Sequence, residues 1–301
     1  MKNEIDSDYI KYCRGVARRT GPNYYFATRY YPKEIREATW CFYAFVRESD
    51  QIVDGNLYAT NQEKIDALGK WASNWEQAYK LGKSPHVSQL AAAAVFRKYK
   101  IPYQYSLDFL TAMADDISID SYQTYEDLRT YMYGSAGVIG AIMSYIVGFE
   151  GGEETLSQAV LMGEAMQMAN FIRDVGEDYI SLSRVYLPIE DLKRFNVTKQ
   201  DIANQEYSDN FIKLIKFEIE RTKDLYRESI PYLEKLNPDA RFPILLACLI
   251  YIEVLNYIEN HNYQVLSMKK LQPGLLGKIA CELKLKRLPK AQMVEYVISR
   301  L

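Results

Sequence analysis

Apolar side chains recur at intervals of three and four residues along most of the chain, the spacing of one face of an α-helix. Ala38, Phe42 and Phe45, for example, share one such face. The same pattern predicts long helices over residues 34–52, 62–79, 125–146, 156–180, 210–236 and 242–260. No convincing series of alternating apolar and polar residues predicts strands between these helices.

Prolines and glycines separate the helical segments. They stand at Pro32, Ser84-Pro85, Ile101-Pro102, Gly151-Gly152, Asn237-Pro238 and Pro273-Gly274. Short connections between long helices are typical of a compact all-α domain. Because no linker rich in serine, glycine or proline divides the chain, we expect residues 1–301 to form a single domain.

The composition excludes some partners. The chain has 37 lysine and arginine residues against 39 aspartate and glutamate residues, whereas a nucleic-acid-binding surface needs a basic excess. Its four cysteines are scattered without a CxxC motif, which favours reduced thiols in the cytoplasm. The N-terminus is polar and we find no run of eighteen uncharged apolar residues, so we expect a cytoplasmic protein with at most peripheral contact with the inner face of the membrane.

Two pairs of aspartates with a spacing of four residues lie far apart on predicted helices. They are Asp50 with Asp54, and Asp174 with Asp178. This spacing places both carboxylates of a pair on the same helical face. Magnesium prefers oxygen ligands, and it commonly binds one or two carboxylates together with substrate phosphate oxygens. The two pairs therefore predict a site for magnesium and a phosphorylated substrate.

The second acidic pair continues a polar stripe. Glu164, Gln167 and Asn170 precede Asp174 at intervals of three and four residues on an otherwise apolar helix. We expect this stripe to face water or a charged ligand.

Arginines stand beside both acidic pairs. Arg47 lies three residues before Asp50, and Arg173 adjoins Asp174. Guanidinium groups near metal-binding carboxylates suit a diphosphate, which needs its charge neutralised. The alternative interpretation is ordinary ion pairing at the surface, which contributes little to stability.

Seven segments occur in the order in which one enzyme family has them. They are Tyr25-Phe26-Ala27-Thr28, Pro32-Lys33-Glu34, Trp40 to Asp54, Tyr125-Glu126-Asp127-Leu128, Tyr131 to Gly140, QxxNxxRDxxED from Gln167 to Asp178, and Arg184-Val185-Tyr186-Leu187-Pro188. Together they resemble the squalene/phytoene synthase family, over nearly the whole chain.

The resemblance implies an all-α isoprenoid-synthase fold with helices around a central cavity. It also implies a prenyltransferase that condenses two geranylgeranyl diphosphates head to head, giving phytoene by way of a cyclopropyl-carbinyl diphosphate, prephytoene diphosphate. We favour phytoene because Thr28 is small where a bulky aromatic side chain would shorten the pocket, and because Asp54-Gly55-Asn56 is similar to phytoene synthases. Squalene or dehydrosqualene from two farnesyl diphosphates is the alternative.

The site residues follow from the motifs. The resemblance implies metal binding by Asp50, Asp54, Asn170, Asp174 and Asp178, and it adds Tyr131 and Arg173 to the four aspartates as catalytic residues. The implied substrate-binding residues are Arg47, Gln167, Asn170, Arg184, Tyr186, Tyr251, Lys270, Tyr24 and Thr28. The implied cofactor is magnesium, with manganese as an alternative, and NADPH is not expected for a phytoene synthase.

Two rival functions are weaker. A non-catalytic helical scaffold of the same ancestry is expected to have lost its metal ligands, whereas the four aspartates, Asn170 and both flanking arginines are present. A terpene cyclase acting on one substrate is disfavoured by the paired arginines and by the QxxNxxRDxxED segment.

A third acidic pair stands apart from these motifs. Asp116 and Asp120 are also spaced by four residues, but we expect them at a helix end and in a solvated loop, without a metal role.

Overall fold

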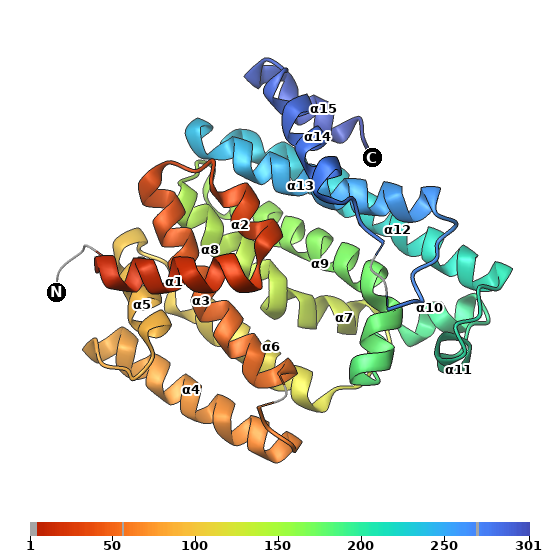
Figure 1. Ribbon diagram of the computed structural model, residues 1–301, viewed down its shortest axis with the longest axis horizontal. Helices are drawn as coiled ribbons and strands as arrows, with labels where there is room; N and C mark the ends of the chain where they lie inside the picture. The colour runs from red at the N-terminus through yellow and green to blue at the C-terminus, as the bar shows by residue number, and fades with distance from the viewer. Residues whose placement is uncertain (1–4, 56, 269–270) are drawn as a thin grey trace.

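The computed structural model describes residues 5–55, 57–268 and 271–301. Within these residues the secondary structure is helical, apart from one antiparallel bridge between Phe149 and Leu236 (Figure 1). The α-helices are α1 (Ser7–Thr20), α2 (Pro22–Thr28), α3 (Lys33–Asp54), α4 (Asn61–Leu81), α5 (Val87–Tyr99), α6 (Tyr103–Ser118), α7 (Tyr125–Met132), α8 (Val138–Val147), α9 (Gly152–Leu182), α10 (Ile189–Arg194), α11 (Lys199–Ala203), α12 (Asp209–Ser229), α13 (Pro238–Asn260), α14 (Leu275–Lys286) and α15 (Met293–Ile298). A π-helical turn, η1 (Tyr133–Gly137), and two 3₁₀ turns, η2 (Ile230–Lys235) and η3 (Lys290–Gln292), complete them.

Local sequence signals set several helix ends. Thr60 accepts a hydrogen bond from the backbone of Glu63, and Glu63 reaches back to the backbone of Thr60, so a capping box begins α4. Thr124 and Asp127 begin α7 in the same way. Gly82 ends α4 with φ +67°, a conformation that glycine adopts without strain.

The helices form two large apolar clusters, which meet where α8 packs against α9, and a smaller third cluster around Tyr131, Met132 and Phe171. The N-terminal cluster joins α1 and α3–α6 around Phe45, Trp75 and Phe96. The C-terminal cluster joins α9, α12 and α13 around Phe211 and Tyr226. In Figure 1 the red to yellow helices therefore lie to the left and below, and the green to blue helices lie to the right and above. Side chains at this junction are contributed by distant parts of the chain.

Glycines allow a close approach of the η1–α8 segment to α9. A Cβ atom on Gly140 would lie 2.1 Å from the carbonyl oxygen of Ala159, and one on Gly163 would lie 2.3 Å from that of Ala136. Any side chain at either position would push the two helices apart. This contact fixes α9, which carries the predicted polar stripe, against the segment that follows Tyr131.

Two predicted helices are divided in the structure. The segment 125–146 is α7, the π-helical turn and α8. Gly134, within the π-helical turn, packs so closely against α6 that a Cβ atom there would lie 2.8 Å from the carbonyl oxygen of Asp108. The segment 210–236 ends as the 3₁₀ turn η2, where Pro231 lacks the N–H that an α-helix requires. The remaining four predicted segments each fall on one helix.

Two helical stretches are long and apolar enough to cross a membrane by length and composition alone. They are Tyr125–Val147 and Pro238–Asn260, and 61% and 56% of their apolar windows are buried inside the protein. Core helices of globular proteins show the same combination, so the two stretches are only weak evidence of a membrane span.

Candidate active site

A cavity of about 420 Å³ lies between α2, α3, η1–α8, α9 and α13. Its polar lining residues are Arg47 and Asp50 of α3, Gln167 and Asn170 of α9, and Ser135 of η1. Its apolar and aromatic lining includes Ala27, Tyr31, Phe42, Val46, Ile139, Met143, Met162, Met166, Ile244 and Ile250. On both α3 and α9 the apolar lining residues precede the polar ones, and both helices run toward the lower right of Figure 1. The polar groups of the two helices therefore lie at the same end of the cavity.

Of the first acidic pair, Asp50 lines this polar end, and Asp54 follows one helical turn later as the last residue of α3. Arg47 forms an ion pair with Asp50, and Arg184 Nη1 lies 3.8 Å from Asp54 Oδ1. Burial and the neighbouring Asp54 raise the pKa of Asp50 to about 6, and Arg47 only partly opposes the shift. Burial also raises the pKa of Asp54. Burial is thus the main cause of both shifts, and at Asp50 the neighbouring carboxylate of Asp54 adds to it.

Asp116 of α6 belongs to the same group of carboxylates, and our prediction that it is a solvated residue is wrong. Only 3% of its surface is exposed. Its Oδ1 lies 3.1 Å from Arg184 Nη1 and accepts a hydrogen bond of 3.0 Å from the hydroxyl of Tyr186. Burial raises the pKa of Asp116 to about 6, a shift that Arg184 opposes and Asp54 adds to. Asp120, in contrast, is exposed.

The chain reversal after α9 brings Arg184 to this group. Ser183 ends α9 with φ +56°, and the backbone N–H of Arg184 then donates to the carbonyl oxygen of Asp178 at 3.3 Å. Arg184 also donates to the backbone carbonyl of Asp116 and, at 3.2 Å, to the hydroxyl of Tyr186. It is therefore held by α6, the end of α9 and its own following residues at once.

A stack of aromatic rings lies beside Asp116. Phe171 and Tyr186 stack with ring centroids 4.2 Å apart, and Tyr131 lies 6.0 Å from Tyr186 and 5.2 Å from Tyr122. All four rings are buried. Tyr131 and Tyr186 were predicted from the motifs, whereas Tyr122 and Phe171 were not.

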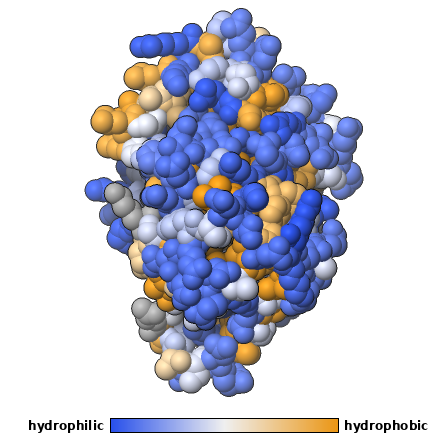
Figure 2. Space-filling view, turned by 90° about the vertical axis from the view of Figure 1, so that its right-hand side faces the viewer, coloured by the Kyte–Doolittle hydropathy of each residue, from blue (hydrophilic) through white to orange (hydrophobic). Residues whose placement is uncertain are grey.

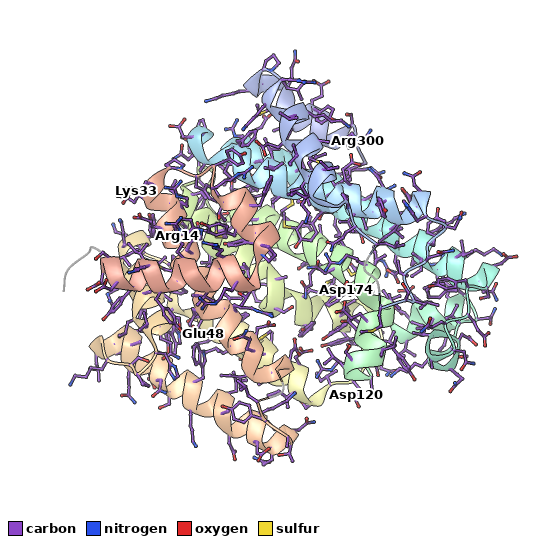
Figure 3. All side chains as sticks on the ribbon, in the orientation of Figure 1. Arg14, Lys33, Glu48, Asp120, Asp174 and Arg300 are labelled. Atoms are coloured by element: carbon purple, nitrogen blue, oxygen red, sulfur yellow. The ribbon has the colours of Figure 1, made fainter. Side chains whose placement is uncertain are left out.

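The second acidic pair, on α9, is arranged differently. Arg173 donates two hydrogen bonds to Asp174, at 2.8 and 2.6 Å, so this carboxylate has a bidentate partner within its own helix. Asp178 is half-buried one turn later. Asn170 donates to Gln167 at 3.5 Å, and both line the cavity. Figure 3 places Asp174 well inside the outline of the molecule and Asp120 at its lower edge.

Three of the four remaining predicted residues, Tyr24, Thr28 and Tyr251, line the cavity. Tyr24 stacks on Tyr43 with centroids 4.7 Å apart, and its hydroxyl donates to the sulfur of Met143 at 3.7 Å. Thr28 is buried and accepts a hydrogen bond of 3.0 Å from the indole N–H of Trp40. Tyr251 of α13 lines the cavity close to Arg173. Lys270 lies outside the described residues.

Glu164 departs from the predicted stripe. It is buried away from the cavity lining and lies 3.3 Å from Arg129 of α7. The prediction that the whole stripe faces a ligand therefore fails at this residue, because a structural ion pair accounts for it.

The residues at the polar end fit a divalent cation that shares its ligands with a substrate. Among the described residues, no three acidic, histidine or cysteine side chains are close enough to form a complete metal site. However, Asp54 and Asp116 both raise the pKa of Asp50, so the carboxylates repel one another without a cation. A hard cation held by few carboxylates and by phosphate oxygens suits such a group.

The sequence matches a known family over most of its length. A family model described as squalene/phytoene synthase matches residues 17–276. The 15-cis-phytoene synthase of Synechocystis sp. is 31% identical over 272 residues, which are 87% of this chain and 80% of that protein. The 15-cis-phytoene synthase of Synechococcus elongatus is 29% identical, over 89% of each chain.

Solved structures confirm the predicted fold. A dehydrosqualene synthase in complex with a ligand aligns with a TM-score of 0.84 and 24% identity, over 93% of this chain and 96% of that one. A squalene synthase from Alicyclobacillus acidocaldarius aligns with a TM-score of 0.77, also at 24% identity, over 85% of this chain and 95% of that one. The predicted all-α isoprenoid-synthase fold is thus confirmed, and with the match to residues 17–276 the chain belongs to the squalene/phytoene synthase family.

Proposed function

We propose that this protein is a prenyltransferase that condenses two geranylgeranyl diphosphates head to head to phytoene. The observation that carries the proposal is one cavity whose lining changes from apolar residues to Arg47, Asp50, Gln167 and Asn170. A prenyl diphosphate has the same division, because it joins a long hydrocarbon chain to a charged group. The choice of the C20 substrate is supported by the names of the phytoene synthases that the chain resembles.

The arginines and aspartates would act on the diphosphates. Arg47 and Arg184 lie beside carboxylates at the polar end, where each can turn its remaining N–H groups toward phosphate oxygens. Asp50, Asp54, Asn170, Asp174 and Asp178 would hold magnesium. When bound, the cation would take up negative charge that develops on the departing diphosphate.

Asp116 acts through its neighbours in this proposal. It is a positioning residue, because its carboxylate contacts Arg184 and Tyr186 while its own surface is almost fully buried. By fixing Arg184, it keeps a guanidinium group next to Asp54 before any substrate binds. Such preorganisation lowers the cost of stabilising charge in the transition state.

The aromatic and apolar residues would protect the carbocation. Loss of diphosphate leaves an allylic cation, whose C1 must bond to the double bond of the second prenyl chain before water reaches it. The rings of Phe42 and Tyr251 line the cavity, and the partial negative charge on their faces suits a cation, while the apolar lining excludes water. Tyr131, Tyr186 and Phe171 stack on one another outside this lining and would support the site from behind. The proton released when the cyclopropane closes would pass to the diphosphate.

A C15 substrate is the second candidate. Solved structures with a similar fold include a dehydrosqualene synthase and a squalene synthase. Two farnesyl diphosphates would then give squalene or dehydrosqualene, and squalene requires a reductant such as NADPH.

One experiment separates these candidates. The purified protein is incubated with farnesyl or geranylgeranyl diphosphate, with magnesium, with or without NADPH, and the hydrocarbons are identified by mass spectrometry. We expect phytoene from the C20 substrate and no dependence on NADPH. A C30 product formed in preference would favour the second candidate, and the absence of any condensed product would refute the proposed activity.

A chelator tests the metal. Excess EDTA is expected to abolish product formation, and added magnesium is expected to restore it. Turnover that persists in excess chelator would remove the metal from the mechanism.

A further inference from the structure

Helix α14 carries an unusual number of exposed apolar side chains. Leu276 is 82% exposed, Leu275 is 64% exposed and Leu283 is 46% exposed, and Met268 in the preceding loop is 54% exposed. Leu276, Ala280 and Leu283 follow one another at intervals of four and three residues, so they share one face of the helix. Figure 2 shows hydrophobic side chains gathered at the upper left edge of the face drawn there.

Basic residues surround these apolar side chains. Between Lys278 and Lys290 the sequence has five lysine or arginine residues and a single acidic residue, Glu282, although the whole chain has a net charge of −2. Lys284, Lys286, Arg287 and Lys290 are exposed. Glu282 is buried and already paired with Arg29 and Lys286, both at 2.6 Å. The outer side of α14 is therefore both apolar and positively charged.

The position of α14 connects this surface with the cavity. The helix packs against α13, and its Glu282 pairs with Arg29, which directly follows α2. Both α2 and α13 contribute residues to the cavity wall. At the start of α14, burial and the nearby positive charge of Arg173 lower the pKa of Lys278. The start of this helix therefore lies near Arg173 of α9.

We propose that Met268, Leu275, Leu276, Leu283, Lys284 and Arg287, here called the α14 surface, dock the protein on an anionic lipid bilayer. Exposed leucines on a helix can enter the interface between headgroups and acyl chains, and flanking lysines and arginines attract anionic headgroups. The inference rests on the proposed function, because substrates and a product with long hydrocarbon chains partition into bilayers. Docking here would bring the lipid phase to the two helices that wall the cavity.

The bilayer fits better than a protein partner or a second copy of the chain. A second copy would present the same positive surface, and two such surfaces would repel each other in a symmetric dimer. Basic side chains beside exposed leucines are complementary to the negative charge and the apolar interior of an anionic membrane.

Vesicle binding tests the proposal. The full chain is sedimented with vesicles of phosphatidylglycerol and phosphatidylcholine, and with vesicles of phosphatidylcholine alone. We expect binding to the anionic vesicles that weakens with salt. The variants L275S/L276S and K284E/R287E are each expected to bind the anionic vesicles at least about tenfold more weakly than the wild-type protein. The matched control is L81S, because Leu81 is 64% exposed at the end of α4, outside this surface.

The outcomes separate docking from catalysis. With substrate dissolved in detergent, both double variants are expected to keep the wild-type rate, because neither pair of residues lines the cavity. Failure of the wild-type protein to bind anionic vesicles, or equal losses in L81S and L275S/L276S, would overturn the docking proposal. A dimer that L275S/L276S dissociates, with vesicle binding unchanged, would also overturn it. Vesicle binding that depends on the α14 surface, in a protein that condenses no prenyl diphosphate, would refute the proposed function alone.

Discussion

The two acidic pairs look alike in sequence but have different surroundings in the folded chain. Asp174 on α9 is neutralised within its own helix by the two hydrogen bonds of Arg173. Asp50 on α3 has Asp54 and Asp116 near it, and its pKa is raised despite the ion pair with Arg47. On the α9 wall, which carries Asn170, Asp174 and Asp178, Asp174 thus has an arginine of its own. On the α3 wall, which carries Asp50 and Asp54 next to Asp116, Asp50 has two carboxylates and one arginine beside it.

The difference separates two requirements of a diphosphate site. Buried carboxylates close to one another cost stability in the protein without a ligand, and near neutral pH a bound cation relieves this cost. A carboxylate paired with arginine costs less, and it orients a guanidinium group that can bind phosphate. We infer that the α3 wall with Asp116 is the stronger cation site and that the α9 wall combines metal binding with a preset anion contact.

Single variants that remove one carboxylate from either the α3 wall or the α9 wall should lose the most activity. D50N and D174N are each expected to lower kcat by about 1,000-fold or more, because charge on the departing diphosphate would lose its compensation. The measurement is the rate of hydrocarbon formation at saturating substrate, with circular dichroism to verify helical content. The matched control is D120N, at the exposed third pair, which should retain its rate.

If the α3 wall binds the cation more strongly than the α9 wall, the two variants should respond differently to magnesium. High magnesium should recover part of the activity of D174N, since the α3 wall still attracts the cation, and none of that of D50N. Equal recovery in both variants would show that the walls bind metal alike. Near-normal rates in either variant would remove that aspartate from the catalytic assignment.

Changing Asp116 should have a smaller effect. D116N is expected to lower kcat about 10- to 100-fold, because Arg184 and Tyr186 lose their charged partner while the residues predicted to contact substrate and metal remain. A purely structural role would lower thermal stability and leave the magnesium dependence of the surviving activity unchanged. We expect that dependence to shift to higher magnesium concentration, and Y186F, which removes one of the two contacts, to show a weaker form of the same shift.

The burial of Asp116 could have been predicted from the sequence. Phe109, Met113 and Asp116 recur at intervals of four and three residues, so helical periodicity places Asp116 on the buried face of α6. The local sequence after it predicts a loop, and α6 does end at Ser118, but one helical turn decides whether an aspartate is solvated or buried. Applying periodicity to the last turn would have identified Asp116 as a buried carboxylate in need of a partner.

The helices and the family were largely predictable, whereas contacts between distant segments were not. Four of six long helices and the two acidic pairs follow from local pattern, because helical faces are set by residues three and four apart. Gly134 in the π-helical turn packs directly against α6, and the partners of Arg184 come from α3, α6 and the end of α9. Such contacts depend on tertiary packing, which no local spacing encodes.

Without metal, D50N and D174N should change the free energy of unfolding in opposite directions. Burial has raised the pKa of Asp50 to about 6, so D50N removes an unfavourable charge and should stabilise the protein at pH 7 by about 1–3 kcal/mol. D174N leaves Arg173 without its carboxylate and should destabilise the protein by about 1–3 kcal/mol. Urea denaturation at pH 7 measures both changes, and the same sign in both variants would contradict the comparison.

The pH dependence follows from the same shifts. Between pH 4 and pH 6 the folded chain retains protons on Asp50 and Asp116 that the unfolded chain has released, because both pKa values rise to about 6 on folding. Their contribution to the free energy of unfolding is therefore favourable near pH 4 and is lost as the pH rises through 6. The wild-type protein without metal should gain relative stability on acidification across this window, and D50N should gain less. An identical pH profile for the two proteins would show that the pKa of Asp50 is not raised in the folded chain.

A substitution in the apolar part of the cavity, at Thr28, should have the smallest effect, and it should leave the two walls unaffected. Thr28 lines that part and its hydroxyl oxygen accepts a hydrogen bond from Trp40, so T28F both fills space and removes this bond. We expect T28F to shift the ratio of C30 to C40 products a few-fold toward shorter chains, since a phenyl ring shortens the space for a prenyl chain. T28V is the matched control, because it removes the hydroxyl at nearly constant volume and should leave the ratio unchanged. Magnesium dependence should stay at the wild-type value in both variants, because Thr28 touches neither wall. A ratio that changes equally in T28V would assign the effect to Trp40 and not to the length of the cavity, and a shifted magnesium dependence would mean that the polar and apolar ends do not act separately.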